Sequence, residues 1–334
     1  MSDYLVEIKN ERLSFFTPAG EVKALNDVSM YLKEGEVLGI VGESGSGKSV
    51  TSYSIMGITA DPGRIIGGTV EFNGHHIEQL TEKEMRKIRG KEVSMIFQDP
   101  MTSLNPVYTI GKQIEEAILL HTDKTKAQAR ERAVELLRLV GINEPEKRIR
   151  QYPHELSGGM RQRVMIAIAL ACEPKLLIAD EPTTALDVTI QAQILELIME
   201  LKAKLGMAVI LITHDLGIVS SMCDRIAVMY AGKVVECGST DDIFYNPQHE
   251  YTKGLLRSVP HIDEKESKRL VAIEGTPVDM LNPPAGCPFA PRCPECMKIC
   301  LREMPSYTYY SDIHYSACWM RQKEEFENGG REDG

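Results

Sequence analysis

The sequence predicts an α/β fold in which helices cover a parallel sheet on both faces. Short apolar, β-branched runs alternate with longer segments of helical periodicity, and this alternation is typical of parallel βαβ units. The runs are apolar along their whole length, as in strands that are buried on both faces. A glycine-rich turn at 42–49 joins one such run to a helical segment, which is where this fold class usually binds ligands.

The N-terminal part is expected to be rich in β-structure, because residues 1–42 alternate apolar runs with turn signals. Further along the chain, short strands and helices follow one another. Strands are expected at 37–41, 65–73, 93–97, 175–179 and 208–213. Helices are expected at 49–57, 81–89, 111–120, 126–140, 157–172 and 189–205.

The composition is that of an ordinary folded protein. The 334 residues are 43% hydrophobic and 26% charged, and a chain of this length suggests about two domains. A net charge of −10 disfavours sequence-independent nucleic-acid binding, which needs a basic face. The longest uncharged apolar run, Val164–Cys172, is far shorter than the roughly 20 residues of a spanning helix. The first residues lack a secretory signal, so we expect a cytosolic chain.

Residues 42–49 match the pattern GxxxxGK[ST]. The backbone N–H groups of such a loop point at a polyphosphate, and the helix that follows adds its dipole. Lys48 is expected to reach the β- and γ-phosphates, and the Ser49 hydroxyl to ligate Mg²⁺. The alternative is a flexible Gly/Ser turn that matches by chance, but the flanking strand and helix favour a nucleotide site. The residues assigned to ATP binding in this segment are Gly42, Ser44, Gly45, Ser46, Gly47, Lys48, Ser49 and Val50.

An acidic pair ends the apolar run that starts at residue 176. Asp180 suits Mg²⁺, directly or through water. Glu181 is placed to orient the attacking water as the catalytic carboxylate. Gln98 and His214 each follow an apolar strand; Gln98 is expected at Mg²⁺ or the water, and His214 at the γ-phosphate. On its own, each of these residues would be interpreted as an ordinary structural residue at a strand end. The phosphate loop at 42–49 is what favours a functional role for them.

The segment LSGGM at 156–160 resembles the LSGGQ signature of the ATP-binding cassette (ABC) ATPases, with Met160 in place of Gln. A serine and two glycines at a helix start form a second anion site. ALD at 185–187 resembles the D-loop of that family, and THD at 213–215 its H-loop. The residues assigned to the signature are Leu156, Ser157, Gly158 and Gly159, and the D-loop residue is Asp187.

The resemblance implies an ABC-type P-loop NTPase cassette with a RecA-like core, a β-rich N-terminal subdomain and a helical signature subdomain at about 105–165. The ABC ATPase domain is expected at 1–255, and a small Cys-rich C-terminal extension at 256–334. Two cassettes would close head-to-tail around two ATP molecules, each site combining the phosphate loop of one subunit with the signature of the other. In this family an aromatic residue stacks on adenine. Phe15 is preferred over Phe16, and packing within the sheet is the structural alternative for both.

Three longer segments, GIVGESGSGKSV, FQDPMTSLNPVYTIGKQI and YPHELSGGMRQR, resemble the D-type ATPases of dipeptide and oligopeptide importers. This implies a peripheral protein on the cytoplasmic face of the cell membrane. Its partners would be a second ABC ATPase (an F-type subunit or a second copy), two transmembrane permeases and an extracytoplasmic peptide-binding protein, and no nucleic acid. By the same resemblance, 99–106 would lie near the groove that receives a permease helix.

Two alternatives to peptide import remain at this point. Importers of nickel or glutathione use near-identical ATPases, so the cargo rests on the resemblance alone. A soluble ABC ATPase acting on nucleic acid is disfavoured by the acidic balance, the single phosphate loop and the absence of sustained heptads between Ser49 and Leu156.

Five of the eight cysteines fall between residues 287 and 318. In a cytosolic chain such a cluster favours a metal centre over disulfides, and four thiolates suit Zn²⁺ or a [4Fe–4S] cluster. The wide, proline-rich spacing favours the iron–sulfur cluster over Zn²⁺, which is the alternative metal. The alternative without a metal is a set of free thiols. The resemblance selects Cys287, Cys293, Cys300 and Cys318 as ligands and leaves Cys296 as a spare.

Overall fold

The computed structural model describes residues 4–99, 103–184, 186–258 and 272–323. The chain forms two compact units. The first combines Met1–Tyr31, Leu38–Glu78 and Thr213–Gly334, and the second combines Leu32–Val37 and Gln79–Ile212. These units divide the chain at other places than the expected domain boundary at 255, which stays a prediction.

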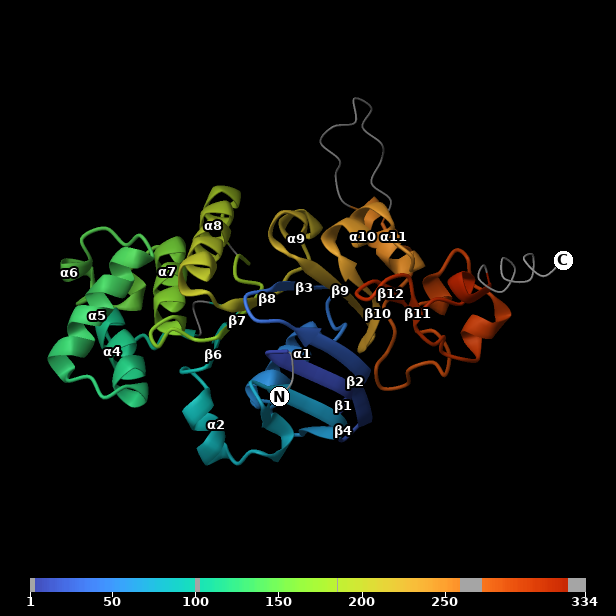
Figure 1. Cartoon of the computed structure of the whole chain (residues 1–334), viewed down its shortest axis with the longest axis horizontal. Helices are drawn as coiled ribbons and strands as arrows, with labels where there is room; N and C mark the ends of the chain where they lie inside the picture. Colours follow the sequence, from blue (N-terminus) through green and yellow to red (C-terminus); the bar gives the residue numbers. More distant parts are fainter. Residues whose placement is uncertain (1–3, 100–102, 185, 259–271, 324–334) are drawn as a thin grey trace, which may run out of the picture. The chain divides into compact units, whose positions relative to one another are not determined.

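An antiparallel sheet forms the N-terminal part of the first unit, with the strand order β2-β1-β4-β5 (Figure 1). Strand β1 runs antiparallel to β4, from Val6 opposite Phe72 to Phe15 opposite Gly63. The β-rich N-terminal region expected from the sequence is therefore confirmed. The strands are β1 (Val6–Thr17), β2 (Gly20–Leu32), β4 (Gly63–Phe72) and β5 (His75–His76).

A second group of strands in the first unit has the order β11-β12-β10-β9-β3. β3 is parallel to β9, every residue of both is buried, and β9 and β10 form an antiparallel hairpin. The short C-terminal strands extend this sheet beyond β10. The strands are β3 (Val37–Val41), β9 (Arg225–Tyr230), β10 (Lys233–Ser239), β11 (Thr308–Tyr309) and β12 (Tyr315–Ser316).

The described residues of the first unit also form four α-helices. Asp215 starts α9 by accepting a hydrogen bond from the Gly217 N–H at 2.8 Å, and Ser239 starts α10 through a capping box. The helices are α1 (Lys48–Met56), α9 (Leu216–Met222), α10 (Thr240–Tyr245) and α11 (Glu250–Arg257).

The second unit contains three parallel strands in the order β8-β7-β6, all of them buried throughout. Helices α4, α5 and α7 pack against one another (Figure 1). The strands are β6 (Val93–Ile96), β7 (Leu176–Asp180) and β8 (Ala208–Ile212). The helices are α2 (Glu82–Ile88), α4 (Ile110–His121), α5 (Lys126–Leu139), α6 (Pro145–Arg148), α7 (Gly158–Ala169) and α8 (Val188–Leu205).

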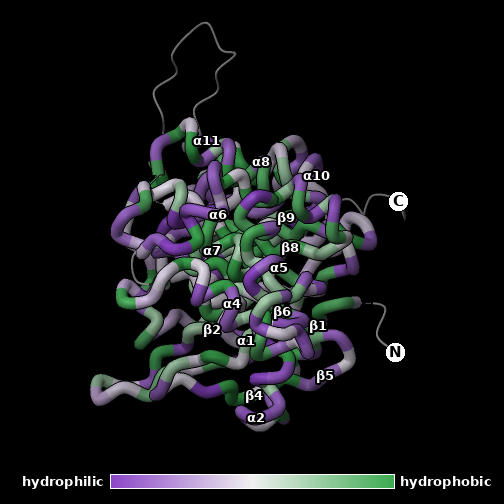
Figure 2. Tube along the Cα trace, turned by 90° about the vertical axis from the view of Figure 1, so that its left-hand side faces the viewer, coloured by the Kyte–Doolittle hydropathy of each residue, from purple (hydrophilic) through white to green (hydrophobic). Residues whose placement is uncertain are grey.

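Hydropathy follows burial within each unit. Figure 2 shows hydrophobic residues along β8 in the second unit and β9 in the first, whereas α2 is mainly hydrophilic. Within the described ranges, no helix combines the length and the apolar character needed to cross a membrane. The α/β fold expected from the sequence is confirmed.

Candidate nucleotide site

The phosphate loop, residues 42–49, connects β3 to α1 and is held close to its neighbours by glycine. Gly42 has φ +152°, and a Cβ atom there would lie 2.1 Å from the carbonyl oxygen of Met229. Gly47 has φ +100°, and a Cβ atom there would lie 2.9 Å from the carbonyl oxygen of Ala24. Only glycine fits at these two points, so the path of the loop is fixed by backbone on both sides.

The side chains of the phosphate loop fit a phosphate group. Lys48 is buried, and its Nζ donates hydrogen bonds to the carbonyl oxygens of Gly42 at 2.8 Å and Glu43 at 2.9 Å. The Ser46 hydroxyl is buried and has no hydrogen-bond partner among the described residues. An unsatisfied buried hydroxyl costs about 1–3 kcal/mol, and a phosphate oxygen that accepts its proton would remove this cost. The loop thus offers a cation and an unpartnered donor in one small space.

The acidic pair lies at the end of β7 in the second unit. Asp180 is only 2% exposed, and Glu181 has φ +46°, a backbone conformation that is uncommon outside glycine and is found often at functional sites. Oε2 of Glu181 accepts hydrogen bonds from Gln98 Nε2 at 2.8 Å and Thr184 Oγ1 at 2.9 Å. The structure therefore brings Gln98 and Glu181 together, and two neutral donors fix the orientation of this carboxylate.

Thr184 was not singled out from the sequence. The only local signal is its place three residues after Glu181, the spacing at which a hydroxyl in a turn can reach back to the earlier side chain. A Thr at such a spacing is too common to have identified it alone.

The signature segment starts α7 in the same unit. Ser157 is the N-cap residue, and its hydroxyl accepts a hydrogen bond from the Met160 N–H at 3.4 Å. Leu156 is buried, whereas Ser157 and Gly158 are exposed. The first N–H groups of a twelve-residue helix are thus accessible from outside, as binding of an anion there requires. Asp187 is the N-cap residue of α8.

Two further parts of the predicted site lie in the first unit. Phe15 is half-buried where β1 pairs with Gly63, whereas Phe16 is 47% exposed, so the choice between them stays a prediction. His214 is exposed directly after β8. Ala185 of the D-loop segment and residues 100–102 of the predicted permease groove lie outside the described residues.

The predicted iron–sulfur cluster is wrong, and its zinc alternative has no support either. In the portion of the chain that the structure describes, no group of three or more His, Cys, Asp or Glu side chains could hold a metal ion. Of the four expected ligands, Cys287, Cys300 and Cys318 are buried and Cys293 is half-buried. Burial raises the pKa of Cys287 to about 11 and that of Cys293 to about 12.

These cysteines instead act as small apolar residues of the C-terminal core. The backbone N–H of Cys287 donates to the carbonyl oxygen of Cys300 at 2.8 Å, which closes the loop between them.

Comparison with known proteins decides the family. A family model described as "ABC transporter" matches residues 25–184, and one described as "Oligopeptide/dipeptide transporter, C-terminal region" matches residues 235–300. The oligopeptide transport ATP-binding protein OppD of Bacillus subtilis (strain 168) is 56% identical over 317 residues, which cover 95% of this chain and 88% of that protein. The chain belongs to the ABC transporter family. The dipeptide transport ATP-binding protein DppD of the same organism is 54% identical, over 96% of this ABC chain and 95% of its own length.

Solved ABC structures support the same assignment. The ATP-binding cassette MJ0796, in a dimeric post-hydrolysis state bound to ADP and Pi, matches with a TM-score of 0.64 at 30% identity. The match covers 70% of this ABC chain and 98% of that cassette. The structure of cbiO1 from Clostridium perfringens matches with a TM-score of 0.63, also at 30% identity, over 73% of this chain and 92% of its own. The chain is thus an ATPase of the ABC family, as its motifs predicted.

Proposed function

We propose that this chain is the ATP-hydrolysing subunit of a membrane importer, and that it couples ATP binding and hydrolysis at a cassette dimer interface to uptake of dipeptides or oligopeptides. The observation that carries the proposal is the Glu181 carboxylate, which Gln98 and Thr184 fix at the end of a buried strand. We infer the cargo from the relatives OppD and DppD, which are named for oligopeptide and dipeptide transport. The matches to this chain cover 88% and 95% of their lengths.

ATP is the nucleotide of the family, and the phosphate loop supplies its binding groups. The ammonium of Lys48 neutralises charge on the β- and γ-phosphates, and the Ser46 hydroxyl donates to a phosphate oxygen. Phe15 stacks on adenine. The remaining contacts come from the backbone N–H groups of the glycine-rich loop.

Mg²⁺ is the metal that the donor set fits, because Ser49, Gln98 and Asp180 offer only oxygen ligands. When bound, the ion neutralises charge on the β- and γ-phosphate oxygens. Asp180 contributes a carboxylate that is almost fully shielded from water, where its charge acts most strongly.

Glu181 orients and polarises the water that attacks the γ-phosphate, and His214 contacts that phosphate. Gln98 holds Glu181 from one side, and this places an amide beside the reacting water. A carboxylate fixed by two donors needs little reorganisation when the water loses its proton.

A second cassette completes each site. The accessible N-terminus of α7, with Leu156, Ser157, Gly158 and Gly159, binds the γ-phosphate held by the partner, and Asp187 lies at the same junction. The dimeric state named for the MJ0796 cassette supports this arrangement. The partner is an F-type ATPase or a second copy of this chain, beneath two permeases that a peptide-binding protein supplies, on the cytoplasmic face of the membrane.

The proposal is tested with Glu181→Gln in the full chain assembled with its permeases. ATP binding is expected to persist while phosphate release and uptake of a labelled dipeptide fall by at least about 100-fold, as for loss of a catalytic base. Glu196→Gln, on the exposed face of α8, is the matched control and should keep full activity. Normal turnover by Glu181→Gln would refute the role of Glu181. ATP-driven uptake of nickel or glutathione but not of dipeptide would refute the cargo.

A further inference from the structure

The C-terminal extension contacts the phosphate loop through an ion pair between Arg292 and Glu43. Nη1 of Arg292 lies 2.6 Å from Oε2 of Glu43, and Nη2 lies 2.9 Å from Oε1, so the pair is bidentate. The side chain of Arg292 is 4% exposed and that of Glu43 is 27% exposed. A bidentate pair that is largely shielded from water fixes both side chains more firmly than a surface ion pair does.

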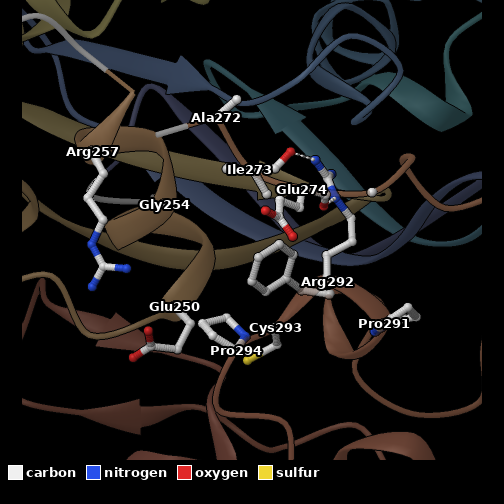
Figure 3. A pocket seen from close by; sticks show the side chains of 12 residues that line it. Glu250, Gly254, Arg257, Ala272, Ile273, Glu274, Pro291, Arg292, Cys293 and Pro294 are labelled. Carbon is white, nitrogen blue, oxygen red and sulfur yellow. Dashed lines mark hydrogen bonds between the residues drawn. The ribbon is translucent and has the colours of Figure 1, made fainter. Parts of the chain in front are cut away.

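Arg292 is itself held by its other donors. Its Nε donates to the carbonyl oxygen of Glu274 at 2.9 Å, and Nη2 donates to that of Ile273 at 3.2 Å. Figure 3 shows the Arg292 side chain extending toward Ile273 and Glu274. Nη1 also lies 3.3 Å from the Tyr230 hydroxyl, at the end of β9. The guanidinium thus joins three separate segments of the first unit.

Glu43 is in turn held at three points. Its carboxylate is bound by Arg292, its N–H donates to the Tyr251 hydroxyl at 2.8 Å, and its carbonyl oxygen accepts from Lys48 Nζ at 2.9 Å. Tyr251 is fully buried and packs against the ring of Phe289, which lies three residues before Arg292. Since Lys48 is the phosphate-binding cation, the position of the Glu43 backbone sets where that cation lies.

The same extension covers one side of the loop. Residues 277, 278 and 280 line a narrow cavity of about 110 Å³ together with residues 43–46. The carbonyl oxygen of Met280 accepts a hydrogen bond from the Lys23 N–H in β2 at 3.1 Å, which fixes this segment in place. The loop therefore meets the extension by both packing and charge.

We propose that Arg292 is a positioning residue for nucleotide binding: its ion pair with Glu43 holds the phosphate loop in the form that accepts phosphate, so that the C-terminal extension sets the nucleotide affinity of the cassette. This rests on the proposed function, because it takes the loop at 42–49 as the ATP site. Arg292 acts through Glu43 and Lys48 and does not itself touch the nucleotide.

The test measures the dissociation constant of ADP by titration calorimetry on the purified full chain, for the wild type, Arg292→Gln, Arg292→Lys, Glu43→Gln and the double variant Arg292→Gln/Glu43→Gln. Arg292→Gln is expected to weaken ADP binding by about fivefold or more, the lower end of coupling between sites. Lys keeps the charge but not the bidentate fork, so Arg292→Lys should recover part of the loss. The dissociation constant of the double variant for ADP should lie within about twofold of that of the single variant that binds ADP less tightly, because both single changes break the same interaction.

Arg302→Gln removes a charge from an exposed position in the same extension and serves as the matched control, with unchanged ADP affinity expected. Thermal unfolding without nucleotide is measured in parallel. Wild-type ADP affinity in Arg292→Gln, with only a lower unfolding temperature, would overturn the inference and leave a purely structural ion pair. If Arg292→Gln does not fold, Arg292→Lys and Glu43→Gln decide by the same criterion. Failure of the wild type to bind ADP would refute the proposed function, and the inference with it.

Discussion

Replacing Thr184 by valine tests whether the orientation of Glu181 limits the reaction. Valine keeps the shape of threonine but removes the Oγ1 donor that lies 2.9 Å from Oε2 of Glu181. The Gln98 donor, at 2.8 Å, remains. The variant therefore removes one of two hydrogen bonds to the carboxylate and leaves the carboxylate itself in place.

The magnitude follows from the kind of bond that is lost. A hydrogen bond to a charged group is worth about 1.5–3 kcal/mol. Thr184 and Glu181 are both only half-buried, so the lower end applies. Each 1.36 kcal/mol of barrier is a factor of ten in rate, and we therefore expect kcat for ATP hydrolysis to fall about tenfold. The KM for ATP should change by less than about twofold, because the bond acts on the water and not on the nucleotide.

The assay is steady-state phosphate release by the assembled transporter. Thr184→Ser keeps the hydroxyl and should restore most of kcat. Thr122→Val is the control. It removes a part-buried hydroxyl that donates to the carbonyl oxygen of Ile118 in α4 at 2.7 Å, so it shows the effect of losing a comparable hydrogen bond away from Glu181. If Thr184→Val turned over ATP as fast as the wild type, Glu181 would not need this donor and the reasoning from its geometry would fail.

Three further changes have expected outcomes. Lys48→Ala should abolish ATP binding, measured by calorimetry, since it removes the buried cation of the loop; unchanged ATPase activity would exclude Lys48 from the site. Ser46→Ala removes an unsatisfied buried hydroxyl, so the nucleotide-free chain should be as stable or about 1 kcal/mol more stable in denaturant unfolding. The same variant should bind ADP more weakly. A loss of folding stability as large as the loss of ADP-binding free energy would contradict the role of that hydroxyl. Burial raises the pKa of Glu11 from 4.5 to about 7, so the folded state binds more protons than the unfolded state and stability should fall as pH rises from about 4.5 to 7. Glu11→Gln should remove up to about 3 kcal/mol of that decline, and an identical pH profile in Glu11→Gln and the wild type would assign the decline to other groups.

The sequence predicted those parts of the fold whose signals are local. Strands β3, β6, β7 and β8 were expected because each is a short apolar run, and the structure buries every residue in them. Helix α8 was expected at 189–205 and spans Val188–Leu205, because a long periodic segment ends at Gly206 in the left-handed conformation.

Strand β9 was missed although its signal was present. Residues 226–230 are apolar and are followed by a turn, but the charge of Arg225 opens the run. In the structure Arg225 is buried, because its guanidinium lies 3.8 Å from the centre of the Tyr31 ring and donates to the Tyr31 carbonyl oxygen at 2.5 Å. Tyr31, the partner that allows this charge in a buried strand, is 194 residues away in the sequence, so the local pattern around Arg225 could not predict it.

The cysteine cluster failed for the opposite reason. Five thiols close in sequence gave a strong local signal, but metal binding needs three or four of them to converge as thiolates. Cys287, Cys300 and Cys318 are buried, and within the described residues no group of three or more His, Cys, Asp or Glu side chains could hold a metal ion. The local clustering of cysteines was real, but the metal centre inferred from it was wrong.

The phosphate loop explains why a contact with Arg292 can act on binding without competing for the nucleotide. A loop of this kind binds phosphate mainly through backbone N–H groups, so the pattern GxxxxGK[ST] leaves the residue after Gly42 unspecified. Its side chain can therefore be used by another part of the protein at no direct loss of phosphate contacts. In this chain the residue is Glu43, and its carboxylate is bound by a residue 249 positions away. Because the backbone of the same residue accepts from Lys48, an interaction made outside the loop reaches the one side chain in it that must carry positive charge.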